Sequence, residues 1–166
     1  MLSMSEADLR AAIVAEARTW VGTPYGDNQR VKGAGVDCGY LLLAVYAAVG
    51  AVPDFRPDYY APQHHLHSSD EVYLRYVLDR ATESPGPPGP GDVVMFRFGR
   101  VFSHAGIVVG WPMIVHAMRL DGVTLDNVER CILGPRALDN LPRRYFTLWP
   151  EMSEDSGARE AVVIND

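Results

Sequence analysis

The feature that most constrains the fold is a run of apolar residues that begins just after a cysteine. Residues 33–50 read GAGVDCGYLLLAVYAAVG, and residues 41–49 would be apolar on nearly every side of a helix. Such a helix has to be buried, because it has no polar face to turn toward water. We therefore expect a core helix that begins at Asp37 or Cys38 and ends at Gly50, where a glycine can close it.

Helices are expected first along the chain and strands afterwards. Ser5 can cap a first helix that stops near Gly22, and a third helix is expected over about residues 71–82. Residues 83–92, ESPGPPGPGD, carry four prolines and three glycines and predict a stiff connector. The later segments have alternating and β-branched residues, which predict strands of one antiparallel sheet at residues 92–98, 103–110, 113–118, 122–128 and 143–150.

This separation of helices from strands predicts an α+β domain with the core helix packed on one face of the sheet. A chain of 166 residues with 48% hydrophobic content has material for one core, which we assign to a domain over residues 1–150. Residues 151–166 hold five acids and one arginine. We expect them to form a flexible acidic tail.

Charge and hydropathy argue against two classes of function. The net charge is −6 and no basic patch is visible, so nucleic acid is not an expected partner. No apolar stretch reaches the roughly 20 residues that a membrane span needs. The N-terminus lacks the basic start and apolar middle of a secretory signal, so a protein that does not export itself is expected.

Cys38 stands at the first turn of the expected core helix, where free backbone N–H groups and the helix dipole favour a thiolate. This position is typical of a prepared nucleophile and predicts a depressed thiol pKa. The alternative interpretation is a small buried side chain, which is the common environment of free cysteine. This one stretch does not separate the two readings.

Two histidines supply a matching base. A turn centred on Gly110 would place His104 opposite His116 on adjacent strands, with both side chains on one face of the sheet. One imidazole could then take the proton of Cys38 while the other orients it. Packed histidines without chemistry are the first alternative. Zinc held by Cys38, His104 and His116 is the second.

The other histidines and the second cysteine give weaker signals. His64, His65 and His67 lie in a polar loop without a ligand spacing, and solvated side chains or the lining of a cleft would explain them. Cys131 alternates with apolar residues, which favours simple packing. A disulfide between Cys38 and Cys131 is disfavoured, because a domain of this size needs no such crosslink.

Five motifs in order resemble the NlpC family of cell-wall cysteine peptidases, whose core is papain-like. The motifs are WVGTPY (20–25), GVDC (35–38), PGDVVMFRFG (90–99), SHAGIVVG (103–110) and IVHA (114–117). The resemblance is strongest to members from phage tails and gene transfer agents. It assigns the nucleophile to Cys38, the general base to His104 and the orienting residue to His116.

The resemblance also implies residues that shape the substrate site. Tyr25 corresponds to an aromatic wall residue, although packing beside Trp20 would explain it equally well. Asp37 precedes the nucleophile and could cap the helix or contact substrate, and the cap is the favoured role. The family usually has Ser and Gly after the cysteine, whereas Gly39 and Tyr40 follow here, so Tyr40 adds bulk to the adjoining subsite.

The activity implied by the resemblance is hydrolysis of amide bonds in peptidoglycan stem peptides, without a cofactor or a metal. Delivery would be by a phage-like tail, with assembly in the cytoplasm, a place at the tail tip and action in the periplasm or cell wall. The partners would be tail or baseplate proteins. Two alternatives are a structural tail component with little turnover and a thiol acyltransferase, although such acyltransferases tend to carry the histidine before the cysteine.

Overall fold

The computed structural model describes residues 3–58, 71–133 and 136–149, and it confirms the α+β class. Its helices are α1 (Glu6–Thr19), α2 (Cys38–Ala48) and α4 (Val72–Leu78), with a short 3-10 helix η1 (Leu138–Asn140). An antiparallel sheet has the order β3 (Thr82–Ser84), β10 (Arg143–Thr147), β4 (Val93–Phe98), β5 (Val101–Gly110), β6 (Met113–Met118), β7 (Gly122–Asn127). Two small ribbons pair β1 (Arg30–Val31) with β2 (Gly35–Val36), and β8 (Ile132–Leu133) with β9 (Arg136–Ala137).

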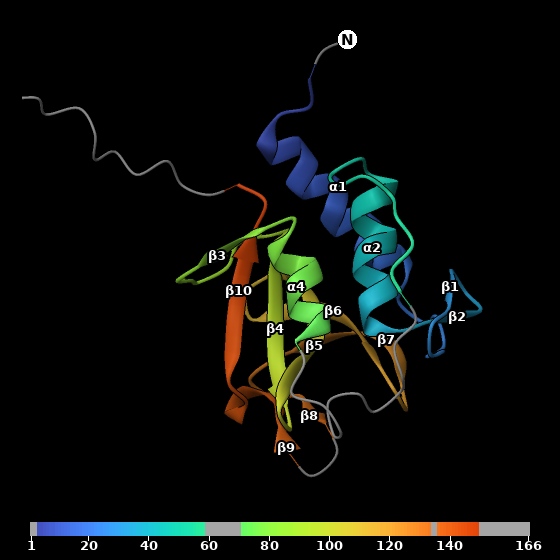
Figure 1. Cartoon of the computed structure of the whole chain (residues 1–166), viewed down its shortest axis with the longest axis vertical. Coiled ribbons are helices and arrows are strands. Elements are labelled where there is room, and N and C mark those ends of the chain that lie inside the picture. Colours follow the sequence, from blue (N-terminus) through green and yellow to red (C-terminus); the bar gives the residue numbers. More distant parts are fainter. Residues whose placement is uncertain (1–2, 59–70, 134–135, 150–166) are drawn as a thin grey trace, which may run out of the picture.

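The core helix α2 forms as the sequence predicts. Asp37 is its N-cap, and the helix ends before Gly50, which has a positive φ of 74°. Figure 1 shows α2 beside α1, and α2 also contacts β5 and β6. Burying each large apolar side chain contributes about 1.5–3 kcal/mol, so this helix is the main anchor of the domain. Its fully or nearly buried residues are Leu41, Leu42, Leu43, Ala44, Val45 and Tyr46.

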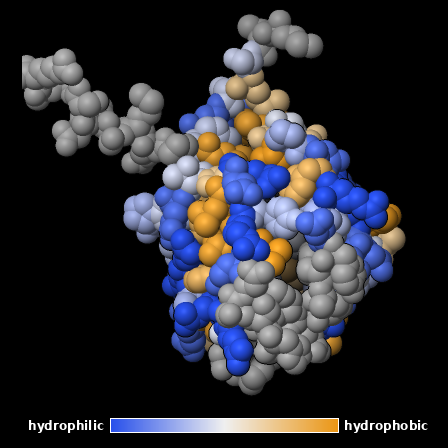
Figure 2. Space-filling model, in the orientation of Figure 1, coloured by the Kyte–Doolittle hydropathy of each residue, from blue (hydrophilic) through white to orange (hydrophobic). Residues whose placement is uncertain are grey.

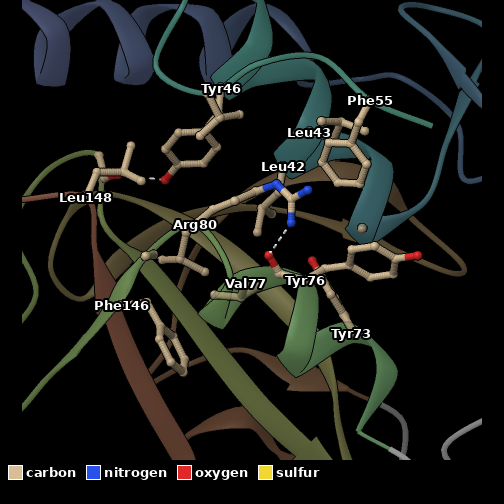
Figure 3. Close-up of a pocket in the computed structure, with 15 residues that line it drawn as sticks. Leu42, Leu43, Tyr46, Phe55, Tyr73, Tyr76, Val77, Arg80, Phe146 and Leu148 are labelled. Atoms are coloured by element: carbon tan, nitrogen blue, oxygen red, sulfur yellow. Dashed lines mark hydrogen bonds between the residues drawn. The ribbon is translucent and has the colours of Figure 1, made fainter. Parts of the chain in front are cut away.

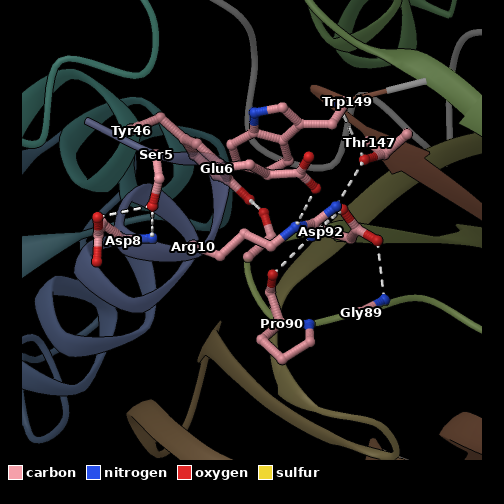
Figure 4. Close-up of polar contacts among 11 residues, drawn as sticks. Ser5, Glu6, Asp8, Arg10, Tyr46, Gly89, Pro90, Asp92, Thr147 and Trp149 are labelled. Carbon is pink, nitrogen blue, oxygen red and sulfur yellow. Dashed lines mark hydrogen bonds and ion pairs between the residues drawn. The ribbon is translucent and has the colours of Figure 1, made fainter. Parts of the chain in front are cut away.

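Besides its buried face, helix α1 has an arginine that bonds to residues next to the sheet (Figure 4). Ser5 caps the helix by accepting from the N–H of Asp8. The guanidinium of Arg10 donates to the carbonyl of Pro90 at 2.7 Å and to the carboxylate of Asp92 at 2.9 Å, and it lies 4.2 Å from the ring of Trp149. Arg10 therefore joins α1 to the loop before β4 and to the segment after β10.

The predicted third helix and connector differ from the structure. Helix α4 ends at Leu78, and Thr82 already begins strand β3, which pairs with β10. The predicted connector therefore starts inside the sheet, because tertiary pairing with Tyr145 overrides the turn-forming composition that begins at Pro85. The other predicted strands are confirmed within a few residues of their ends.

The register of the β5–β6 hairpin also differs from the prediction. The structure pairs His116 with Gly106 rather than with His104, so the predicted facing pair is wrong by two residues. The turn is at Trp111 and Pro112 rather than at Gly110, and the register shifts between Val108 and Gly110. A β-bulge of this kind adds one residue to one strand and moves every later partner. His104 and His116 become diagonal neighbours instead.

The surface of the described part is mixed. Figure 2 shows apolar residues reaching one face of the molecule in patches between hydrophilic ones. Among the described residues, no helix has both the length and the apolar content to cross a membrane. The predicted tail at 151–166 and the cluster His64, His65 and His67 lie outside the described residues.

Candidate active site

The thiol of Cys38 lies against the strand segment that carries His104. Cys38 is the first residue of α2, and its Sγ donates to the carbonyl oxygen of Ser103 at 3.5 Å. The backbone N–H of Ala105 bonds to the same sulfur. The two residues that flank His104 in the chain thus hold the candidate nucleophile beside that histidine.

The predicted depression of the thiol pKa is wrong for this structure. Burial, with help from the Asp37 carboxylate, raises the pKa of Cys38 to about 12, while backbone N–H groups of Ala105, Cys38 and Gly39 act in the opposite direction. A helix terminus contributes at most about 2 kcal/mol, or about 1.5 pKa units. Burial can shift a pKa by about 3–5 units, so desolvation outweighs the helix dipole.

Burial acts on His104 in the opposite sense, because it disfavours the protonated imidazole. It lowers the pKa of His104 well below 6.5, and repulsion from a protonated His116 ring would act in the same direction. The rings of Phe96 and Phe98 lie 6.1 and 5.8 Å from the imidazole, centre to centre, and supply apolar surroundings. Burial therefore favours the neutral forms of both the Cys38 thiol and the His104 imidazole.

A hydrogen-bonded chain runs from His104 diagonally across three strands. Nε2 of His104 on β5 lies 2.9 Å from Nδ1 of His116 on β6, and Nε2 of His116 lies 2.8 Å from Oδ2 of Asp126 on β7. Thr124 donates to the same oxygen at 2.6 Å. His116 is fully buried, so its ring is fixed by these two contacts. The structure thus brings together the two predicted histidines in spite of the different register.

Sequence reasoning missed Asp126. Its pKa is lowered, first by the hydrogen bond from His116 and then by that from Thr124, so the carboxylate stays ionised. Asp126 pairs with Ile114 and is thereby a diagonal neighbour of His116. The sequence feature that could have indicated this partner is the alternation of Thr124 and Asp126 within the predicted strand 122–128, which follows the strand of His116.

Tyr25 and Asp37, which were predicted to line the substrate site, have different surroundings. Tyr25 is half-buried, and burial first and then the charge of Cys38 raise its pKa. Asp37 is 1% exposed, and its two carboxylate oxygens accept from the N–H groups of Tyr40 and Asn28 at 2.9 and 2.8 Å. Asp37 is therefore the helix cap, and its predicted part in substrate binding is not supported by this arrangement.

Two hollows adjoin the start of α2. Tyr40 lines an open, polar one of about 450 Å³ together with Arg30, Asp54 and Arg56. A smaller apolar cavity of about 80 Å³ lies between α2 and α4 (Figure 3), where the guanidinium of Arg80 sits 3.8 Å from the ring of Phe55.

Tyr73 of α4, which sequence reasoning also missed, lines this apolar cavity. It donates its hydroxyl to the carbonyl of Cys38 at 3.0 Å. Tyr73 is therefore a further aromatic side chain that holds the first turn of α2.

Comparisons with known proteins give a curated relative and solved structures of the same fold. A sequence of the probable endopeptidase p60 from Listeria grayi is 27% identical over 127 residues, which are 76% of this chain and 21% of the relative. The chain thus spans about a fifth of that curated relative.

Two solved structures show the same fold. The NlpC/p60 domain of the peptidoglycan hydrolase SagA is 24% identical, with a TM-score of 0.53 over 72% of this chain and 89% of that one. RipD of Mycobacterium tuberculosis, described as a non-catalytic NlpC/p60 domain protein adapted to peptidoglycan binding, is 14% identical with a TM-score of 0.52, over 85% of this chain and 98% of that one. The model of the NlpC/P60 family matches residues 22–140, and the chain belongs to this family.

Proposed function

We propose that the chain is a cysteine peptidase that hydrolyses amide bonds in peptidoglycan stem peptides. The observation that carries the proposal is the hydrogen-bonded chain from His104 through His116 to Asp126, together with the Cys38 thiol that bonds to Ser103, the residue before His104. A domain that only binds a ligand has no use for a buried imidazole pair aligned behind a thiol. The family and its named relatives support the substrate class.

The contacts determine where the protons lie. Ionised Asp126 can only accept, so Nε2 of His116 carries a proton and donates it. With one ring proton, His116 has a free lone pair on Nδ1, which accepts from Nε2–H of His104. Nδ1 of His104 is then unprotonated. This leaves a lone pair on the base for the proton of Cys38.

Catalysis in this site proceeds by general-base activation when substrate binds. The S–H of Cys38 turns from the carbonyl of Ser103 to Nδ1 of His104, and the proton moves as sulfur attacks the amide carbon. The backbone N–H of Cys38 stabilises the oxyanion, and we assign polarisation of the carbonyl to Tyr25.

His104 then gives its proton to the leaving amine, and water hydrolyses the thioester with His104 again as base. His116 and Asp126 are positioning residues, because they act through His104.

The test is digestion of purified peptidoglycan with mass analysis of the released fragments. The wild-type protein should release fragments with new amino and carboxyl ends, and Cys38→Ala should lower the rate by about 10⁴-fold or more while leaving the fold intact. Binding to peptidoglycan without new ends would contradict the proposal and favour a role like that described for RipD. Equal activity of Cys38→Ala would contradict the assignment of the nucleophile.

We also propose delivery by a phage-like tail, with the protein at the tail tip acting in the periplasm or cell wall. The resemblance of the five motifs to tail and gene-transfer-agent members supports this. The protein should co-purify with tail particles that contain other baseplate proteins. Recovery of the protein only apart from such particles would contradict it.

A further inference from the structure

A second group of metal-binding side chains lies at the far end of the histidine chain. The ligand atoms of His116, Asp126 and Cys131 all lie within 4.8 Å of one another. This set differs from the zinc ligands that the sequence offered as an alternative, since it contains neither Cys38 nor His104. The sequence predicted simple packing for Cys131.

The fold holds Cys131 at this place through its backbone. After β7, the N–H of Cys131 donates to the carbonyl of Asn127 at 2.9 Å, and its own carbonyl accepts from the N–H of Leu138 at 2.9 Å. The chain therefore folds back, so that the thiol lies beside the carboxylate that ends the histidine chain. Asp126 keeps 35% of its side chain exposed, which gives an ion a path from solvent, whereas Cys131 is 9% exposed.

The donor set matches one class of cation. Thiolate, imidazole and carboxylate together are typical ligands of zinc, with water in the fourth position of the tetrahedron. The carboxylate of Asp126, which lies within 4.8 Å of the other two ligand atoms, also attracts a dication.

We propose that Nε2 of His116, a carboxylate oxygen of Asp126 and Sγ of Cys131 bind a Zn²⁺ ion, and that this ion inhibits the peptidase. Binding is independent of the proposed function, whereas inhibition rests on it. The ion replaces the hydrogen bond between His116 and Asp126, and the proton of Cys131 leaves to solvent.

Inhibition follows from the direction of the hydrogen bonds. A neutral imidazole that binds metal through Nε2 carries its proton on Nδ1. His116 would then donate from Nδ1 to Nε2 of His104, and the single proton of His104 would move to its own Nδ1. Each ring keeps one proton, but the base no longer has a lone pair toward Cys38.

The binding arm uses Co²⁺ as a spectroscopic probe for zinc in the Cys38→Ala protein. This background removes the nucleophile, so a thiolate-to-cobalt absorption band can arise only from Cys131. One equivalent of Co²⁺ should give that band, and Zn²⁺ should remove it. The band should be absent in Cys38→Ala/Cys131→Ala. A band that persists in the double variant, or no band in the single one, overturns the site.

The activity arm measures peptidoglycan hydrolysis against free Zn²⁺, with reversal by chelator. Cys131→Ser and Cys131→Ala should retain basal activity, and each should need at least about tenfold more Zn²⁺ for half inhibition. Inhibition at the same concentration in both variants would place the inhibitory ion at Cys38 and overturn the regulatory part. If the wild type shows no hydrolysis, the proposed function fails while the cobalt band still tests the site.

Discussion

The two cysteines lie near opposite ends of the hydrogen-bonded chain that runs from His104 through His116 to Asp126, and their surroundings differ in kind. Burial is the largest cause that raises both thiol pKa values, to about 12 for Cys38 and about 11 for Cys131. Intrinsic acidity therefore does not distinguish them. Cys38 adjoins a histidine that can take its proton, whereas Cys131 adjoins a carboxylate that stays ionised. We therefore expect the reactivity of the two thiols to depend on the neighbouring base and not on thiol acidity.

The sharpest way to test this difference is removal of the base. His104→Ala should lower the rate of peptidoglycan hydrolysis by about 10²–10⁴-fold, because the neutral Cys38 thiol then has no proton acceptor. Alkylation of Cys38, followed by peptide mass analysis, should slow in the same variant while alkylation of Cys131 stays unchanged. Equal slowing of both cysteines would show a general structural effect instead.

A weaker hydrogen bond between Asp126 and His116 should have a smaller effect on hydrolysis than removal of His104. Asp126→Asn should lower kcat by about tenfold and leave KM unchanged, because the amide keeps an acceptor oxygen for His116 but loses the charge that favours donation toward it. Asp121→Asn, which alters an exposed acid on the preceding turn, is the matched control and should leave kcat unchanged. An equal fall in kcat in both variants would contradict a positioning role for Asp126.

The pH profile should show a base that stays neutral in mild acid. Because burial lowers the pKa of His104 below 6.5, the imidazole keeps its lone pair as the pH falls through 6.5. The acidic limb of kcat/KM should therefore lie below pH 6.5. Ultraviolet absorbance should show no thiolate at neutral pH, since both thiol pKa values are raised. An acidic limb at or above 6.5 would contradict the buried environment of His104.

The smallest effect is expected at the second cysteine. Cys131→Ala should change zinc-free activity by less than about twofold, because the residue touches no reacting atom. It should lower the free energy of unfolding by about 1 kcal/mol through lost packing in the core around Val128 and Leu138. Denaturant unfolding with a parallel hydrolysis assay measures both. A large activity loss without metal would place Cys131 in the catalytic machinery.

The sequence predicted the helix of Cys38 and the partnership of His104 and His116 because local signals determine them. The cap at Asp37, the apolar run and the strand alternation are all read within a few residues. The exact register was not predicted, because the turn lies at Trp111 and Pro112 rather than at Gly110, and the bulge near Val109, which then shifts the pairing by one residue, has no local signature.

Asp126 and the thiol pKa needed tertiary information. A single acid on a strand is informative only when its diagonal neighbour is known, and desolvation depends on the packing around α2. The spacing argument thus identified His104 and His116 as neighbours, while the structure supplied their register and the place of Asp126.

The position of β10 in the sheet affects the order in which the strands can pair during synthesis. Strands β4 to β7 join in sequence order through short connections, so they can pair early. Strand β10 inserts between β3 and β4, and Arg143 pairs with Phe96 across 46 intervening residues. During synthesis, one edge of β4 therefore stays open until residues 143–147 have left the ribosome. The hairpin that carries His104 and His116 can form before the sheet around it is complete.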